Sequence, residues 1–266
     1  MEKSFIYVGV DISKLTFDVA IFKNGIYYHH KFSNDLKGFK SFIKLLNTDN
    51  CCVMEASGPY YLNLAFFLVD QGIAVSVINP LVIRRFSQMR MLRAKTDKKD
   101  AAMIAEYGKT ERPVLWEKEE NYVLELKQMQ AYCEQLNKSR TGLIRQKQAF
   151  EANPVQSQIV MNSLNKQVEE LEQQLKFIEK EMVSLIKQYH PEQYQQLKSI
   201  PGIGPKSAMG LIVLSGGFTK FSNAKQLSSY VGISPRIFES GTSVKGKARI
   251  CKMGMSRIRA ILYVCS

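Results

Sequence analysis

The sequence has few of the residues that indicate thiol, zinc or membrane chemistry. Its five cysteines are odd in number and form no Cys-x-x-Cys pair, so they indicate neither a disulfide framework nor a zinc knuckle. No run of about 18 apolar residues occurs, and Met1-Glu2-Lys3-Ser4 lacks the charged-then-apolar pattern of a signal peptide. We therefore expect a cytoplasmic protein with no membrane partner.

Acidic residues are scarce beside basic ones, with 24 Asp and Glu against 37 Lys and Arg and a formal net charge of +13. A basic surface attracts polyanions and gains affinity by releasing their counterions, although net charge alone does not separate DNA from RNA or an acidic membrane. Basic residues gather in one group near residues 84–99 and in another near the C-terminus. The candidate nucleic-acid-binding residues in these groups are Arg84, Arg85, Arg90, Arg93, Lys95, Lys245, Lys247, Arg249, Lys252 and Arg257.

The first 115 residues alternate short apolar runs with helical patterns. The strands are predicted at residues 5–11, 15–22, 26–33, 51–54 and 73–78, and Asn24-Gly25 is a hairpin turn signal. Helices are predicted after Asn34 or Asp35, at about residues 60–70, after Asn79-Pro80 and after Thr96. The order β-β-β-α-β-α-β-α is that of an α/β ribonuclease H-like fold, in which the first and fourth strands are neighbours.

Four carboxylates fall where this order brings them together. Asp11 and Glu55 each follow a strand, and Asp97 and Asp100 are three apart on one helix. Carboxylate oxygens are ligands that Mg²⁺ prefers, and two Mg²⁺ about 3.5 to 4 Å apart can stabilise charge in phosphodiester chemistry. Each acid alone could equally cap a turn or a helix. Together, beside a basic cluster, they predict a two-metal Mg²⁺ site for a phosphodiester substrate.

Residues 116–192 form a predicted helical arm. Apolar residues from Leu164 to Tyr189 alternate spacings of four and three, which is typical of a coiled-coil seam, and an earlier seam is interrupted by Arg140 and Lys147. Asn153-Pro154 separates the two, so the pattern predicts a long antiparallel helical pair. Such an arm could join protomers, span a substrate or serve as an intramolecular spacer.

Residues 193–266 form a predicted, mostly helical third domain. Its first segment, residues 197–208, has the helix, Gly-apolar-Gly turn and helix of a helix-hairpin-helix motif, in which Gly202 and Gly204 let backbone N–H groups approach a phosphate and Lys206 adds charge. A helix at 223–231, a loop at 232–246 and a basic helix from about residue 253 follow. Because the chain stops within an apolar run, we expect this domain to be truncated at its C-terminus.

Five motifs in order, VGVDISK, VMEASGPY, LRAKTDKKDA, IPGIGPKSA and ISPRIFESG, resemble those of the insertion-sequence-110 group of transposases and site-specific recombinases, the DEDD transposases, which include pilin-gene inverting enzymes. The resemblance implies a RuvC-like domain whose acidic tetrad maps onto Asp11, Glu55, Asp97 and Asp100. It further implies a coiled-coil arm used in homo-oligomers (dimer or tetramer), and a bridge RNA that selects donor and target DNA.

The same resemblance implies a serine nucleophile in the C-terminal domain. By motif position this serine is Ser240, in Glu239-Ser240-Gly241, with Ser243 as the rival and a plain turn serine as the alternative. The function implied is a DNA transposase that cuts and rejoins strands. Two other readings stay open: a RuvC-like structure-specific endonuclease (resolvase), and an inactive truncated nucleic-acid-binding derivative.

Overall fold

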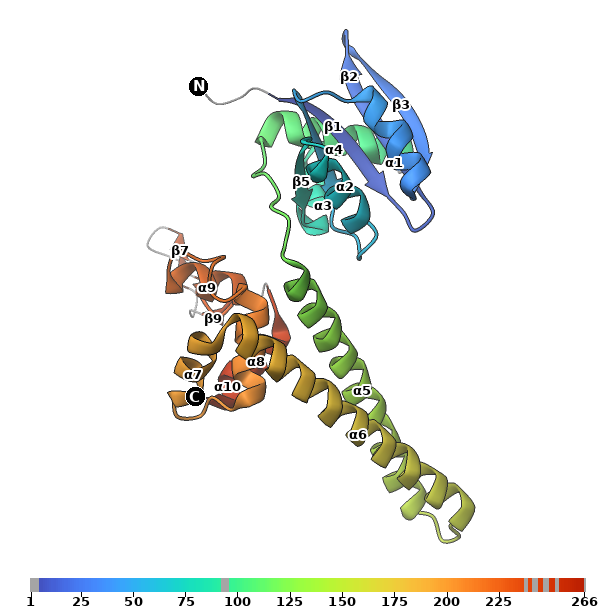
Figure 1. Cartoon of the computed structure of the whole chain (residues 1–266), viewed down its shortest axis with the longest axis vertical. Coiled ribbons are helices and arrows are strands. Elements are labelled where there is room, and N and C mark those ends of the chain that lie inside the picture. The colour runs from blue at the N-terminus through green and yellow to red at the C-terminus, as the bar shows by residue number, and fades with distance from the viewer. Residues whose placement is uncertain are drawn as a thin grey trace. The chain divides into compact units, whose positions relative to one another are not determined.

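The computed structural model describes residues 5–91, 96–236, 239–240, 244–245, 249–251 and 254–265. The chain divides into two compact units, Met1–Lys118 and Glu119–Ser266 (Figure 1). The predicted helical arm and the predicted C-terminal domain both belong to the second unit. Their separation into two domains stays a prediction.

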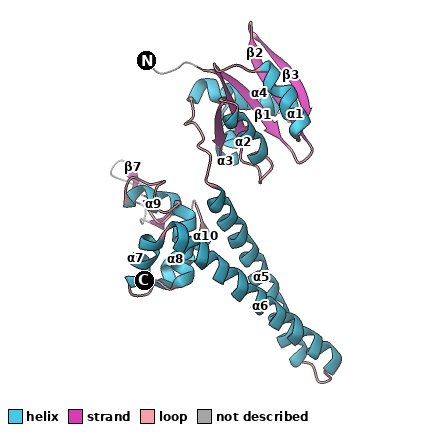
Figure 2. Cartoon of the chain, viewed as in Figure 1, coloured by secondary structure: helices cyan, strands magenta, loops and turns pink. Residues whose placement is uncertain are grey.

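The first unit is built on a five-stranded mixed sheet (Figure 2). Its strands are β1 (Ile6–Ile12), β2 (Thr16–Lys23), β3 (Ile26–Ser33), β4 (Asn50–Glu55) and β5 (Ala74–Ile78), in the order β3-β2-β1-β4-β5. β1 is antiparallel to β2 and parallel to β4. The predicted strands and the predicted contact between the first and fourth strands are therefore confirmed. Asn24 and Gly25, with φ of 51° and 84°, make the tight turn between β2 and β3.

Helices cover both faces of this sheet. They are α1 (Leu36–Phe42), followed by a short 3₁₀ turn (Ile43–Leu45), and α2 (Leu62–Asp70), α3 (Pro80–Met89) and α4 (Asp97–Glu111). Polar side chains cap three of them as the sequence suggests, because Asp35, Asn79 and Thr96 accept hydrogen bonds from backbone N–H groups in the first turns of α1, α3 and α4. The helix starts predicted from these capping residues are confirmed.

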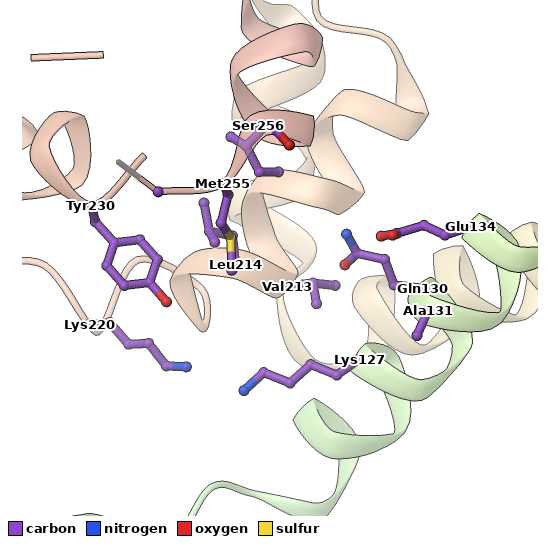
Figure 3. Close-up of a pocket in the computed structure, with 12 residues that line it drawn as sticks. Lys127, Gln130, Ala131, Glu134, Val213, Leu214, Lys220, Tyr230, Met255 and Ser256 are labelled. Carbon is purple, nitrogen blue, oxygen red and sulfur yellow. The ribbon is translucent and has the colours of Figure 1, made fainter. Parts of the chain in front are cut away.

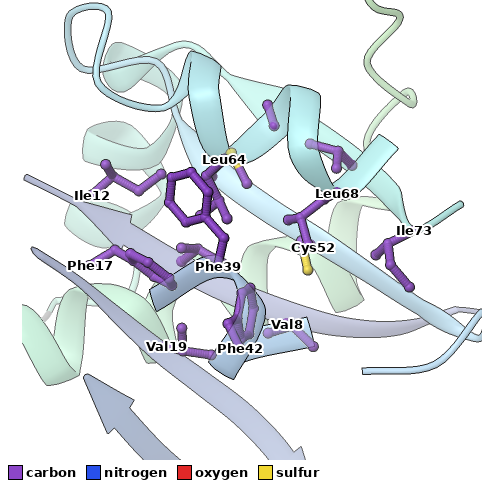
Figure 4. Packing of buried hydrophobic residues seen from close by; sticks show 14 of the residues in the cluster. Val8, Ile12, Phe17, Val19, Phe39, Phe42, Cys52, Leu64, Leu68 and Ile73 are labelled. Atoms are coloured by element: carbon purple, nitrogen blue, oxygen red, sulfur yellow. The ribbon is translucent and has the colours of Figure 1, made fainter. Parts of the chain in front are cut away.

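The face under α1 and α2 carries the larger apolar cluster of this unit. Alternate residues of β1 and β2, such as Val8, Val10 and Phe17, are fully buried there against Phe42 of α1 and Leu68 of α2 (Figure 4). A second, smaller apolar cluster joins the other face to α3 and α4. Its buried members are Cys51, Val53, Ile78, Ile83 and Ile104.

The second unit begins with two long helices, α5 (Asn121–Glu151) and α6 (Gln158–Tyr189), which pack side by side (Figure 1). Leu126 and Leu136 of α5 are buried in one cluster with Leu175 and Ile186 of α6. The chain reverses near Asn153-Pro154, as predicted. The long helical pair is confirmed, and at about 1.5 Å per residue each helix extends roughly 45 Å.

Four shorter helices follow in this unit: α7 (Pro191–Ser199), α8 (Pro205–Ser215), α9 (Ala224–Val231) and α10 (Ser256–Cys265). The predicted loop at 232–246 is wrong in part, because this region contains short strands. Strand β6 (Pro235–Arg236) pairs with β9 (Arg249–Ile250), and β7 (Glu239–Ser240) pairs with β8 (Val244–Lys245). A two-residue strand is too short to show an alternating pattern. The last helix begins at Ser256, three residues later than predicted.

No helix in the described part of the chain is both long and apolar enough to cross a bilayer.

Candidate functional site

The four predicted acids lie at one end of the sheet in the first unit. Asp11 is the last residue but one of β1, Glu55 ends β4, and Asp97 and Asp100 are in the first turn of α4. The threonine cap fixes where that turn begins, with the Lys99 backbone nitrogen 3.3 Å from Thr96 Oγ1. Three elements far apart in the chain thus supply the acids to one place.

The convergence of the acids affects the pKa of the Asp11 carboxyl. Burial is the largest cause that raises the pKa of Asp11, and the negative charges of Asp100, Asp97, Glu55 and Asp18 raise it further, to about 6. A carboxyl shifted this way by burial and by like charges is typical of functional sites. The sheet end is therefore the leading candidate for chemistry in this unit.

Gly9 in β1 lets α4 come close enough to bring Asp97 and Asp100 to this end of the sheet. A Cβ atom on Gly9 would lie 1.9 Å from the Ala101 carbonyl oxygen and 2.4 Å from the Ala105 nitrogen, both in α4. Gly108, two turns further along α4 from Ala101, packs in the same way against Tyr7 and Val53. Helix and strand thus touch backbone to backbone, which places the first turn of α4 beside Asp11.

Two charged residues at this site were missed in the sequence. Asp18 of β2 lies directly opposite Asp11 in the strand pairing, and Lys31 of β3 lies directly opposite Asp18. The Lys31 ammonium is 3.2 Å from Asp18 Oδ2 and 3.9 Å from Asp97 Oδ2. A charged residue in the middle of the apolar run Thr16-Phe17-Asp18-Val19 was the available signal, since it points to the face opposite the buried valines.

The acids suit a divalent metal by their chemistry. Carboxylate oxygens are hard ligands of the kind that Mg²⁺ takes, and the raised pKa of Asp11 marks an excess of negative charge that a cation would relieve. Among the residues that the structure describes, however, no three His, Cys, Asp or Glu side chains are gathered as a metal shell. The site has carboxylate donors at the end of the sheet where β1 and β4 finish, but the described side chains are not spaced as ligands around a metal ion.

Of the basic residues predicted near this site, Arg84 and Arg85 lie on α3 and Arg90 directly follows it. Arg84, Arg85 and Arg90 are exposed. Arg85 donates a hydrogen bond to Gln88, and Arg90 lies 3.7 Å from Glu106 of α4. Arg93 and Lys95 fall outside the described residues. The exposed arginines leave α3 as a positively charged surface of the first unit.

The segment predicted as a helix-hairpin-helix forms α7, a turn and α8. The two glycines and the lysine of this segment differ in what they contact. A Cβ atom on Gly202 would lie 2.6 Å from the Cys265 carbonyl oxygen, so the space beside this glycine is taken by α10. Gly204, at the start of α8, has open space beside it. The Lys206 ammonium pairs with Glu179 of α6 at 2.6 Å. The open part of the motif is therefore the first turn of α8.

The C-terminal candidates are described only in part. The backbone of Ser240 pairs with Val244 across β7 and β8, and Arg249 of β9 is exposed. The side chains of Ser240, Lys245 and Arg257 lie outside the described part of the structure. The rival Ser243, with Lys247 and Lys252, lies outside it altogether. The structure thus describes the backbone of the predicted nucleophile, within β7, and not its side chain.

A cavity of about 450 Å³ opens in the second unit, between α5, α8 and the start of α10 (Figure 3). Its wall combines apolar residues such as Leu214 and Met255 with the charged Lys127, Lys220 and Glu134. The Glu119 carboxylate accepts hydrogen bonds from both lysines, at 2.5 to 2.7 Å. Because these lysines are already paired, the cavity does not present them as a free anion site.

Comparison with known proteins gives matches along nearly the whole chain. A family model described as "Transposase", of the DEDD type, matches residues 8–150, and one described as "Transposase IS116/IS110/IS902 family" matches residues 194–266. The first match contains all four acids and the second contains Ser240.

Individual relatives agree with the family models. The chain is 30% identical to pilin gene-inverting proteins of Moraxella lacunata and Moraxella bovis, covering 97% of this chain and 81% of each relative. It is 24% identical to the transposase of insertion sequence element IS1111A of Coxiella burnetii, covering 80% of this chain and 64% of that protein. The sequence, the sheet with its acids and both family matches agree, and the chain belongs to the IS110 family of transposases.

Proposed function

We propose that this protein cuts and rejoins DNA strands of an insertion sequence, using a divalent metal held by Asp11, Glu55, Asp97 and Asp100. The observation that carries the proposal is the convergence of Asp11 with four other carboxylates from three further elements at one end of the sheet. Together with burial, these carboxylates raise the pKa of Asp11. The order of strands and helices also supports a ribonuclease H-like, and specifically RuvC-like, first unit.

The four acids would act as metal ligands. Bound Mg²⁺, in one or two ions, would stabilise negative charge on the attacking and leaving oxygens of the phosphodiester. Asp11 must be ionised to bind a cation, and its pKa of about 6 leaves it largely ionised at pH 7.5. Asp97 and Asp100, held in the first turn of α4, depend on the contact of that helix with Gly9.

Ser240 is the proposed nucleophile. Its Oγ would attack the scissile phosphorus, forming a phosphoserine bond while the bond to one sugar oxygen breaks and that oxygen takes up a proton. A hydroxyl from another strand would then attack the same phosphorus, release Ser240 and complete the rejoining. Serine needs activation for this step, and no histidine is near Ser240 in the sequence. We therefore propose that a metal ion, rather than a histidine, activates Ser240.

Donor and target DNA are the proposed substrates, and a bridge RNA is the proposed guide. The net charge of +13 and the exposed arginines of α3 support nucleic-acid binding. The long pair α5 and α6 is the proposed surface for forming a dimer or tetramer, with its coiled-coil pattern as support. Phe177 supports this assignment, since it is an α6 residue whose surface is 61% exposed in the single chain.

Trapping of a covalent protein–DNA adduct tests the nucleophile. The purified chain is incubated with Mg²⁺, donor and target DNA and the RNA transcribed beside its gene, and products are separated under denaturing conditions. We expect an adduct with the unchanged protein and none with Ser240→Ala or Asp11→Asn, while Ser243→Ala, the matched control, retains it. Cleavage that survives in Ser240→Ala and disappears in Asp11→Asn would instead identify a resolvase-type endonuclease. Salt-sensitive binding without any cleavage would identify an inactive nucleic-acid-binding derivative.

A further inference from the structure

Lys31 stands out because it places a positive charge among the acids of the first unit. Asp11, Asp18 and Lys31 occupy directly opposed positions on β1, β2 and β3. Directly opposed residues of antiparallel strands project from the same face of a sheet. The contact of Lys31 with Asp97 shows that this is the face covered by α4. The row therefore runs across the sheet into the proposed metal site.

The two contacts of Lys31 differ in burial. Asp18 has a side chain only 12% exposed, and its carboxylate lies 3.2 Å from the Lys31 ammonium. Asp97 has a side chain 70% exposed and lies 3.9 Å away. A buried carboxylate requires a partner, because an unpaired charge away from water is costly. An exposed carboxylate at nearly 4 Å is held weakly and can exchange partners. The ion pair of Lys31 with Asp18 is thus the stronger of the two, and the ion pair with Asp97 is the weaker.

We propose that Lys31 is the resident counter-ion of this acid cluster, bound to Asp18 and competing with divalent metal for Asp97. The inference rests on the proposed metal site and deepens it. In the metal-free protein Lys31 offsets part of the repulsion between the converging carboxylates. Asp97 would be the ligand that exchanges Lys31 for a divalent cation, and Asp18 would hold Lys31. Lys31 therefore lowers the affinity for metal in the absence of DNA.

The placement of the acids is consistent with this exchange. Asp11, Glu55 and the first turn of α4 lie at one end of the sheet. One of the proposed ligands, Asp97, is in contact with Lys31. A lysine that contacts a proposed ligand is in position to compete with a metal ion for it.

Mn²⁺ binding measured by electron paramagnetic resonance tests the proposal on the full chain after removal of metal with EDTA. Lys31→Met keeps an unbranched side chain of similar length and removes the charge. A unit charge roughly 5 Å from a divalent ion is worth about a tenfold change in affinity even in a water-like dielectric. We expect the dissociation constant for Mn²⁺ to fall about tenfold in Lys31→Met and to stay unchanged in Lys31→Arg. Lys23→Met, at the far end of the same hairpin and exposed, is the matched control.

Stability measurements provide a second readout. The single tryptophan, Trp116, packs beside the apolar core of the first unit and reports its unfolding by fluorescence. Without metal, Lys31→Met should unfold at lower urea concentration than the unchanged protein, and Mn²⁺ should raise its midpoint more. An unchanged or weaker Mn²⁺ affinity in a folded Lys31→Met protein overturns the inference alone. Failure of the unchanged protein to bind Mn²⁺, with Asp11→Asn behaving identically, overturns the proposed metal site as well.

Discussion

The two faces of the sheet in the first unit carry different kinds of side chain, although these come from the same strands. Val8, Val10 and Phe17 point to the face under α1 and α2, where they join the larger apolar cluster. Asp11 and Asp18, from the same two strands, point to the face under α4. Strand alternation thus gives one face to packing and adds charged groups to the other, beside its smaller apolar cluster. A change among the apolar residues of the first face should alter stability alone, and a change among the charged residues of the second should alter metal binding and catalysis.

The chemistry of the charged face should be lost most completely with Asp11→Asn. This substitution keeps the shape of the side chain and removes the charge that a metal ligand needs. We expect strand cleavage to fall by at least about a thousandfold, equal to about 4 kcal/mol in transition-state stabilisation. Single-turnover cleavage of a labelled DNA substrate measures this, and a variant that retains a tenth of the rate would contradict the metal role of Asp11.

The apolar face should show the opposite behaviour in Phe42→Ala. Phe42 is fully buried, with its ring 5.5 Å from those of Phe17 and Phe32. Removing such a ring costs the transfer free energy and leaves a cavity, so we expect about 3.5 kcal/mol of lost stability. Urea unfolding followed by Trp116 fluorescence measures it. The fraction that remains folded should bind Mn²⁺ with unchanged affinity; weakened binding would show that the two faces are not independent.

Gly9→Ala should affect both properties, because Gly9 lies on the charged face but acts through packing. The new Cβ would overlap the backbone of α4 at Ala101 and Ala105, so the helix must move away from β1. We expect about 2 kcal/mol of lost stability, and also weaker Mn²⁺ binding, because Asp97 and Asp100 move with the helix. Gly142→Ala is a control for glycine loss that leaves α4 in place, since Gly142 lies within α5 and no atom lies within 4 Å of a Cβ there. Unchanged metal affinity in Gly9→Ala would rule out this positioning role.

The sequence was sufficient for those parts of this arrangement that depend on local pattern. Strand alternation, helical spacing and the caps at Asp35, Asn79 and Thr96 each depend on a few consecutive residues, and they located the elements and the strand order. The four acids followed because each lies at an end of one of those elements.

The missed features depend on residues distant in the chain. Asp18 and Lys31 become part of the site only through the pairing of β1 with β2 and of β2 with β3. The need for Gly9 arises from the packing of α4, and β6 to β9 are too short to show a period. Likewise, the crowding of Gly202 by Cys265 depends on how α10 docks on the hairpin. Local pattern identifies elements, and only their packing shows which side chains meet.

The smallest expected effect is the pH dependence of the metal-free protein, which reports the burial of Asp11 together with the crowding of charge on the α4 face. Asp11 has a pKa of about 6 in the folded chain, above that of an unfolded aspartate. Between these two values the folded state binds more protons, so stability falls as pH rises through about 6. Asp11→Asn lacks this group. It should therefore be more stable than the unchanged protein at pH 7.5 by about 1 kcal/mol, after allowance for solvent screening of a half-buried group. The difference should vanish near pH 4. Urea unfolding in EDTA, followed by Trp116 fluorescence at both pH values, measures it, and a pH-independent difference would mean that neither burial nor like charges raise the pKa of Asp11.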